Sequence, residues 1–253
     1  MTKTMAQTSR VERQDIHNSE VPALCRACEA RHRGVCGALK PDQLVKLSKH
    51  TSKHAYGSDE ELTATGDDVR RYSNILSGVV KLTRLMADGR QQIVGLQFAP
   101  DFLGRPFKSR SDVSAEAATD VTLCSFPKSV IEDMIDGSPE LGHKLHEQAL
   151  KELDEARDWL LTLGRKSATE KVASFLYLIA SHIDPEHKAK DGPICFELPL
   201  KRADIADFLG LTIETVSRQI TKLRKAGTIV VEHNRTITVP DLRRLRDCCE
   251  VDR

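Results

Sequence analysis

The hydrophobic and polar positions between residues 44 and 127 fall into short apolar runs that glycines separate. The runs NILSGVVKLTRL and QQIVGLQF have the length and residue types of β-strands. Asp88-Gly89 lies between these runs and is a typical two-residue hairpin turn. The pattern predicts an all-β domain, a small barrel or roll, that ends near Ser125.

The pattern changes to a helical period after this domain. A helix is expected from about Lys128 to Leu163, and one stripe in its second half has the alternating four- and three-residue steps of a coiled-coil seam. The stripe consists of Ala149, Leu153, Ala156, Leu160 and Leu163. Two chains can pair along such a seam, and its two alanines would let the helices separate easily. The alternative is a long helix that packs only on its own β domain.

The segment LPLKRADIADFLGLTIETVSRQITKLRKAGTIVV contains two short apolar helical faces with Gly210 between them. The faces are formed by Ile205, Ala206 and Leu209, and by Val216, Ile220 and Leu223. This arrangement is typical of a helix-turn-helix, and Thr212 is a candidate N-cap of the second helix. The alternating stretches around His233-Asn234 predict a hairpin. The motif is therefore expected to be a winged helix-turn-helix.

The second helix of such a motif enters the major groove of DNA with its N-terminal residues. Arg218 can donate two hydrogen bonds to guanine, Glu214 can accept one from cytosine, and Ser217 can do either. Lys222 is expected to contact phosphates. The predicted DNA-binding set is Thr212, Glu214, Thr215, Ser217, Arg218 and Lys222. Between residues 201 and 246, ten Lys or Arg face five Asp or Glu, so this part is +5 in a chain of +1. That charge suits a polyanionic partner.

Three cysteines lie within twelve residues near the N-terminus, with the spacing C-x2-C-x7-C. Cys25, Cys28 and Cys36 are surrounded by polar residues that offer little core in which to bury a thiol. Thiolates bind zinc and iron-sulfur clusters, so this segment is predicted to bind metal. Cys124 follows Leu123 and, on its local pattern alone, is expected in the core, but it would supply a fourth sulfur. Zinc and an iron-sulfur cluster both remain open at this point.

Composition sets wider limits. The chain has 253 residues, of which 40% are hydrophobic and 30% charged, as in a soluble protein of two domains. An apolar leader and a membrane-spanning run are both lacking, which predicts a reducing cytoplasmic setting where disulfides are rare. A Gly-rich phosphate loop, an HExxH motif and a paired nucleophile are also lacking, so the chain is not expected to be an enzyme.

The order of these parts, with Glu214-x-x-Ser217-Arg218 in the second helix, resembles the CRP/FNR superfamily of bacterial transcription regulators, and within it the FNR branch. The cysteine spacing looks like that of the FnrN/FnrL type of alphaproteobacteria. The resemblance implies an α+β fold with a jelly-roll-like β-roll sensor domain, a long dimerisation helix and a C-terminal winged helix-turn-helix. We expect a disordered N-terminus at 1–20, the cysteine loop and roll at 21–127, the dimerisation region at 128–164 and the DNA-binding domain at 165–253.

The resemblance also implies a mechanism. Cys25, Cys28, Cys36 and Cys124 would hold an oxygen-labile 4Fe-4S cluster, with which the protein forms a homodimer and binds a palindrome like TTGAT-N4-ATCAA. Oxygen would convert the cluster and release the DNA, and RNA polymerase would be a further partner. One alternative is a CRP-like sensor of a small ligand such as a cyclic nucleotide, although Arg105 follows Gly104 where an acidic residue would be expected. The other is a zinc-stabilised DNA-binding protein with a redox-silent four-cysteine site.

Overall fold

The computed structural model describes residues 21–183 and 192–250. The N-terminus that the sequence predicts to be disordered, residues 1–20, lies outside these ranges. The described chain begins with four short helices, and the three clustered cysteines lie in or directly beside them. They are α1 (Ala23–Arg26), α2 (Glu29–His32), the 3-10 helix η2 (Val35–Ala38) and α3 (Pro41–Ser48). The predicted β domain therefore begins later than residue 44, because Pro41 starts a helix there.

Two four-stranded antiparallel sheets form the predicted β-roll. One sheet has the order β1-β8-β3-β6 and the other the order β2-β7-β4-β5. The strands are β1 (Ser52–Tyr56), β2 (Glu61–Thr63), β3 (Arg71–Ser77), β4 (Val79–Leu85), β5 (Gln91–Phe98), β6 (Phe102–Leu103), β7 (Ser114–Ala117) and β8 (Val121–Pro127). Gly78 has a φ of +89° and lets the chain pass from one sheet to the other between β3 and β4. Gly89 likewise turns the predicted β4–β5 hairpin.

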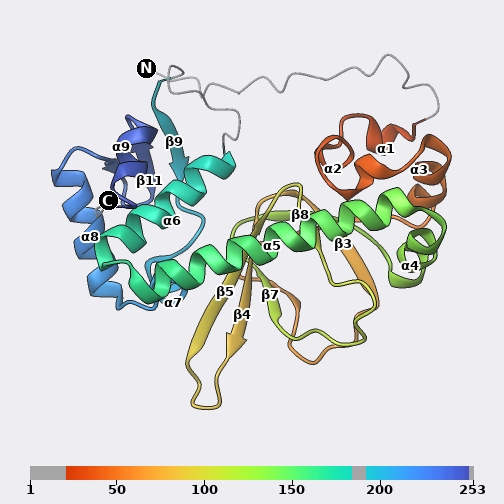
Figure 1. The fold of residues 1–253 in the computed structure, drawn as a ribbon, viewed down its shortest axis with the longest axis horizontal. Coiled ribbons are helices and arrows are strands. Elements are labelled where there is room, and N and C mark those ends of the chain that lie inside the picture. The colour runs from red at the N-terminus through yellow and green to blue at the C-terminus, as the bar shows by residue number, and fades with distance from the viewer. Residues whose placement is uncertain (1–20, 184–191, 251–253) are drawn as a thin grey trace.

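The helical region is broken once. In place of one helix from Lys128, the structure has α4 (Lys128–Gly137) and α5 (Pro139–Arg165). Pro139 is the first residue of α5, and the residue before a proline is disfavoured in a helix, so Ser138 separates the two. In Figure 1, α5 crosses the roll and joins the region of α1–α4 to the C-terminal part of the chain. None of the helices in the described ranges is long and apolar enough to cross a membrane.

The C-terminal part is the predicted winged helix-turn-helix. It contains α6 (Ala168–Ile183), β9 (Ile194–Glu197), α7 (Arg202–Leu209), α8 (Ile213–Lys225), β10 (Val230–Glu232), β11 (Thr236–Val239) and α9 (Leu242–Asp247). Gly210 ends α7 in the left-handed conformation, with a φ of +60°. All six predicted apolar residues of α7 and α8 are less than 5% exposed. The turn of the wing is at His233 and Asn234, which both have positive φ.

Candidate functional site

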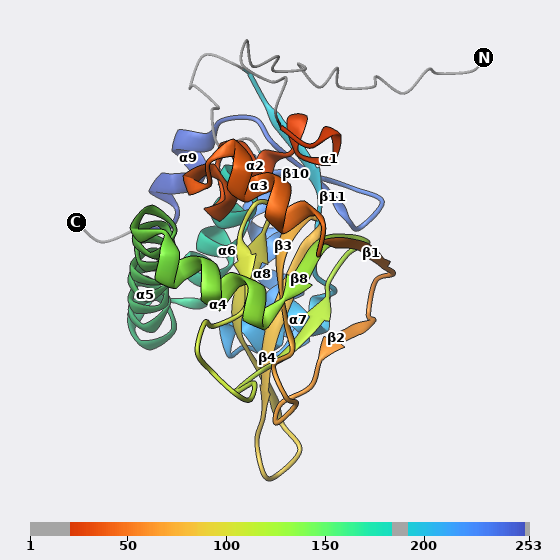
Figure 2. The same cartoon turned by 90° about the vertical axis from the view of Figure 1, so that its right-hand side faces the viewer.

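The structure brings the four candidate cysteines together around one small cavity. Cys25 lies in α1, Cys28 precedes α2, Cys36 lies in η2 and Cys124 lies in β8. Figure 2 shows these short helices stacked over the end of the roll where β3 and β8 run. The cavity measures about 20 Å³, which is room for about one water molecule. Its described lining contains no Asp, Glu or His, so the available soft donors are thiols.

Strand alternation explains how Cys124 reaches this cavity. Successive side chains of β8 point to opposite faces of the sheet. Leu123, 3% exposed, points into the roll, where it packs with Ile75 and Val121. Cys124 is half-buried on the other face, with Asn74 of β3 opposite it in register. The local pattern, which suggested a core residue, could not tell the two faces of this strand apart.

Burial raises the pKa of the thiols of Cys25, Cys36 and Cys124. Burial raises the pKa of Cys36 to about 12, against a hydrogen bond that Asn74 Nδ2 donates to its Sγ at 3.1 Å. Burial, with the neighbouring thiols of Cys28 and Cys25, also raises the pKa of Cys124 to about 11. Binding of a metal centre therefore has to displace protons. Asn74, only 1% exposed, is a residue that the sequence did not single out.

The donor set fits a thiolate-bound centre in its chemistry. The distances between the donors do not fit a bound metal, because in the described ranges no three His, Cys, Asp or Glu side chains form a group that could hold a metal ion. Cys25 and Cys36 belong to one-turn helices and Cys28 is the N-cap of another, whereas Cys124 belongs to a paired strand. Opening the cavity therefore requires the cysteine segment to move rather than the roll.

The seam residues of α5 lie mostly on its exposed side. Leu153 and Leu160 are 45% and 71% exposed in the single chain, and Ala149 and Ala156 are exposed as well. Leu163 is half-buried. A different face of α5 contacts the roll: Gln148 Nε2 donates to the Phe102 carbonyl at 3.2 Å, and Glu152 accepts from Gln148. The helix thus packs on its own roll and still leaves an apolar stripe uncovered.

The recognition helix α8 begins as the sequence predicts. Thr212 is its N-cap, and its Oγ1 accepts a hydrogen bond from the backbone N–H of Thr215 at 3.2 Å. Backbone N–H groups and the Thr212 hydroxyl lower the pKa of Glu214, which is therefore ionised at the start of the helix. Ser217 and Arg218 are exposed one turn further on. Lys222 donates to Thr169 Oγ1 of α6 at 3.2 Å, so it lies toward that helix.

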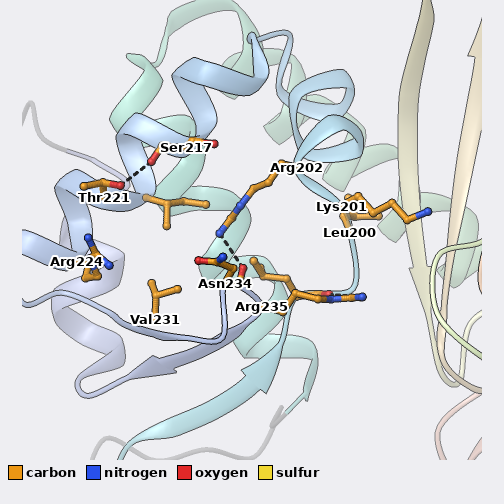
Figure 3. A pocket seen from close by; sticks show the side chains of 11 residues that line it. Leu200, Lys201, Arg202, Ser217, Thr221, Arg224, Val231, Asn234 and Arg235 are labelled. Carbon is orange, nitrogen blue, oxygen red and sulfur yellow. Dashed lines mark hydrogen bonds between the residues drawn. The ribbon is translucent and has the colours of Figure 1, made fainter.

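A basic pocket of about 500 Å³ lies between α8, the start of α7 and the wing (Figure 3). Arg202 points into it from α7, and its Nη2 donates to the carbonyl of Asn234 in the wing at 3.1 Å. The other terminal nitrogen, Nη1, is buried and has no hydrogen-bond partner within the described ranges. Ser217 and Arg224 line the same pocket from α8. Sequence reasoning missed Arg202 because only the fold brings it beside the recognition helix.

The roll also contains a cavity of about 380 Å³. Arg71, Arg105 and Glu152 are among its lining residues. Arg105 follows Gly104 and lies 3.8 Å from Asp112, as an exposed ion pair. This cavity is where the small ligand of the CRP-like alternative would bind.

Known proteins match both halves of the chain. The Crp-like helix-turn-helix domain matches residues 170–248, and the cyclic nucleotide-binding domain matches residues 53–138. A protein of Rhizobium leguminosarum bv. viciae named "Probable transcriptional activator" is 54% identical and covers 92% of this chain and 95% of its own. The transcriptional activator protein FnrL of Cereibacter sphaeroides is 40% identical, with 89% and 93% covered. The structure of FixK2 from Bradyrhizobium japonicum has a TM-score of 0.70 and 31% identity, with 78% and 96% covered.

A sensor roll joined by a long helix to a winged helix-turn-helix defines a DNA-binding transcription regulator rather than an enzyme. The chain belongs to the CRP/FNR family of dimeric transcription regulators, in its FNR branch.

Proposed function

We propose that this chain is an oxygen-responsive transcription regulator, in which Cys25, Cys28, Cys36 and Cys124 hold a 4Fe-4S cluster. The observation that carries the proposal is the convergence of these four thiols, three from the N-terminal segment and one from β8, on one cavity. When bound, the cluster supplies an oxygen-reactive iron centre. The protein with its cluster forms a homodimer that binds a palindrome like TTGAT-N4-ATCAA at low oxygen and activates transcription through RNA polymerase.

The residues around the cysteines connect this site to α5. Val35 of η2 and Leu39 are buried in the same apolar cluster as Leu141 of α5, and Leu145 packs against that cluster. Binding of one metal centre by Cys124 and the three N-terminal cysteines would therefore also restrain the N-terminal part of α5. The proposed seam begins at Ala149, one helical turn after Leu145. A small change in the position of α5 can shift a marginal monomer–dimer equilibrium.

The exposed leucines of α5 support the homodimer. Besides Leu153 and Leu160, the side chains of Leu150 and Leu161 are 48% and 58% exposed. Pairing two copies of α5 along the stripe would remove the apolar surface of Leu153 and Leu160 from water, whereas Leu150 and Leu161 lie beside the stripe. Such burial stabilises a dimer by about 25 cal/mol per Å² of apolar surface. The alanines at 149 and 156 contribute little area, so the seam stays weak enough to respond to the cysteine site.

Anaerobic purification tests the cluster directly. We expect a brown protein that contains about four irons and four sulfides per chain and that loses its visible absorbance in air. The thiol ligands must be deprotonated, so cluster assembly should release protons. A colourless protein with one zinc per chain, stable in air, would instead identify the redox-silent site. A colourless protein without metal that co-purifies with a small molecule would favour the cavity in the roll.

Arg218 is proposed to read a base, and Arg202 to bind a phosphate. Replacing Arg218 by Ala should weaken binding to the preferred palindrome by about 1–3 kcal/mol and relax specificity at a single base pair. The affinities for palindromes substituted at each position, measured by fluorescence anisotropy, would reveal this.

Arg202→Ala provides the contrast. Because Arg202 lies at the start of α7 and is tied to the wing rather than placed on α8, this variant should weaken binding to all palindromes alike and lower the salt dependence by about one phosphate contact. If Arg218→Ala also weakened all sequences equally, Arg218 would have no role in base readout.

A further inference from the structure

A buried lysine connects the roll to the DNA-binding domain. Lys81 lies in β4, and its side chain is 5% exposed. Its Nζ lies 2.8 Å from Glu116 Oε1 on the neighbouring strand β7, where Glu116 is its partner in register. The same Nζ lies 3.0 Å from Asp204 Oδ1 of α7. Burial alone would lower the pKa of Lys81, but the hydrogen bonds to Glu116 and Asp204 raise it, so the ammonium stays charged.

The contact around Lys81 is mostly apolar. Ile93 and Phe98 of β5 belong to the same hydrophobic core as Phe208 of α7. Gln92 Nε2 donates to the carbonyl of Phe208 at 3.3 Å. Phe98 also stacks on His182 of α6, with ring centroids 4.0 Å apart. Apolar contacts of this kind hold two surfaces together but tolerate small sliding movements, whereas a buried charge between two carboxylates requires one register.

We propose that Lys81 is a positioning residue that sets the orientation of the recognition helix relative to the roll. Helix α7 packs on α8, so a restraint on Asp204 also restrains the base-reading residues. In a dimer, the two recognition helices must reach half-sites about one helical turn apart. The Lys81–Asp204 contact thereby selects the spacing between half-sites, whereas α8 selects the bases. The selection of half-site spacing rests on the proposed palindrome, whereas the positioning of the recognition helix by Lys81 does not.

The single tryptophan of the chain reports on this contact without DNA or a cluster. Trp159 of α5 packs against Phe208 of α7, with ring centroids 4.5 Å apart. Lys81→Met should increase acrylamide quenching of Trp159 at least about twofold at temperatures well below unfolding, because α7 is held less firmly. Lys201→Met is the matched control. Lys201 contacts Asp59 of the roll at 2.6 Å, but this pair is exposed, so its loss should leave quenching unchanged.

If Lys81→Met does not fold, two further variants test the two ion pairs of Lys81 separately. Asp204→Asn removes the negative charge of the pair between the domains and keeps a side chain that can accept the Lys201 N–H at the start of α7. Glu116→Gln removes the charge only of the pair within the roll. We expect the quenching change in Asp204→Asn and not in Glu116→Gln. Equal responses of these two variants, or no response in either, would overturn the positioning role.

DNA binding then tests the functional consequence. We would measure affinities for palindromes with spacers of about three to six base pairs, and for a single half-site, with wild type and Asp204→Asn. The wild type should prefer the four-base-pair spacer, and Asp204→Asn should lose at least about tenfold of that preference while half-site affinity is kept. A uniform loss across all spacers would assign the contact to stability alone. If the wild type itself showed no spacer preference, the proposed palindrome would fail, and the Trp159 experiment would still decide the role of Lys81.

Discussion

Replacing Cys28 by Ser should prevent cluster assembly and, with it, DNA binding at low oxygen. A serine hydroxyl does not ionise near neutral pH and is a poor ligand for iron, so three thiols remain where four are needed. We expect the iron content of anaerobically purified protein to fall close to zero. Affinity for the palindrome should fall by about 5- to 150-fold, the range given by a coupling free energy of 1–3 kcal/mol.

Cys195→Ser is the control for this experiment. Cys195 lies on β9 of the DNA-binding domain, is exposed and does not line the cysteine cavity. Its replacement should leave iron content and DNA affinity unchanged. Replacing Cys248 and Cys249, which follow α9, should likewise leave the cluster intact. A Cys28→Ser protein with full iron content and full activity would refute the proposed ligand set.

Replacing Leu160 by Glu should convert the anaerobic dimer to a monomer. The side chain is 71% exposed in the single chain, so a glutamate costs the protomer little. In a parallel coiled-coil seam the same residue from each chain faces its counterpart, and the two carboxylates would be buried close together. We expect a loss of about 2 kcal/mol or more of dimerisation free energy, which is about a 30-fold weaker dimer, measurable by anaerobic sedimentation.

Leu161→Glu is the matched control because Leu161 is also an exposed leucine, 58% exposed, on the next position of the same helix. One residue corresponds to a rotation of about 100° around the helix, so Leu161 lies outside the proposed stripe. This variant should dimerise nearly as well as wild type. If Leu161→Glu were a monomer and Leu160→Glu remained a dimer, the dimer would use the neighbouring stripe of α5 instead. Thermal unfolding of both variants checks that each protomer stays folded.

Local patterns were sufficient where the responsible forces are local. The apolar faces of α7 and α8, the left-handed Gly210 between them and the cap at Thr212 follow from helix periodicity, the missing Cβ of glycine and a side-chain oxygen near free N–H groups. The Asp88-Gly89 turn is local in the same sense. Pro139 was equally visible in the sequence, and its effect on the preceding residue accounts for the break that the seam pattern concealed.

The candidate sites depended on contacts between distant segments. Glu152 looks like one of many charges on the solvated side of a helix, yet it is half-buried and accepts hydrogen bonds from Gln148 and Gln97. Burial raises its pKa accordingly. Lys81 looks like an ordinary strand lysine until α7 packs against β4 and β5. Periodicity cannot reveal such roles, because they depend on which surface covers a residue rather than on its neighbours in the chain.

The sequence by itself determined the order of the parts, the helix-turn-helix and the presence of a cysteine group, because each depends on residues a few positions apart. Only the tertiary structure decided that Cys124 faces the N-terminal cysteines, that Arg202 lies beside the recognition helix and that Lys81 lies between two domains. These arrangements arise when strands pair and domains pack, and a shift of one residue in strand register would have turned Cys124 into the roll.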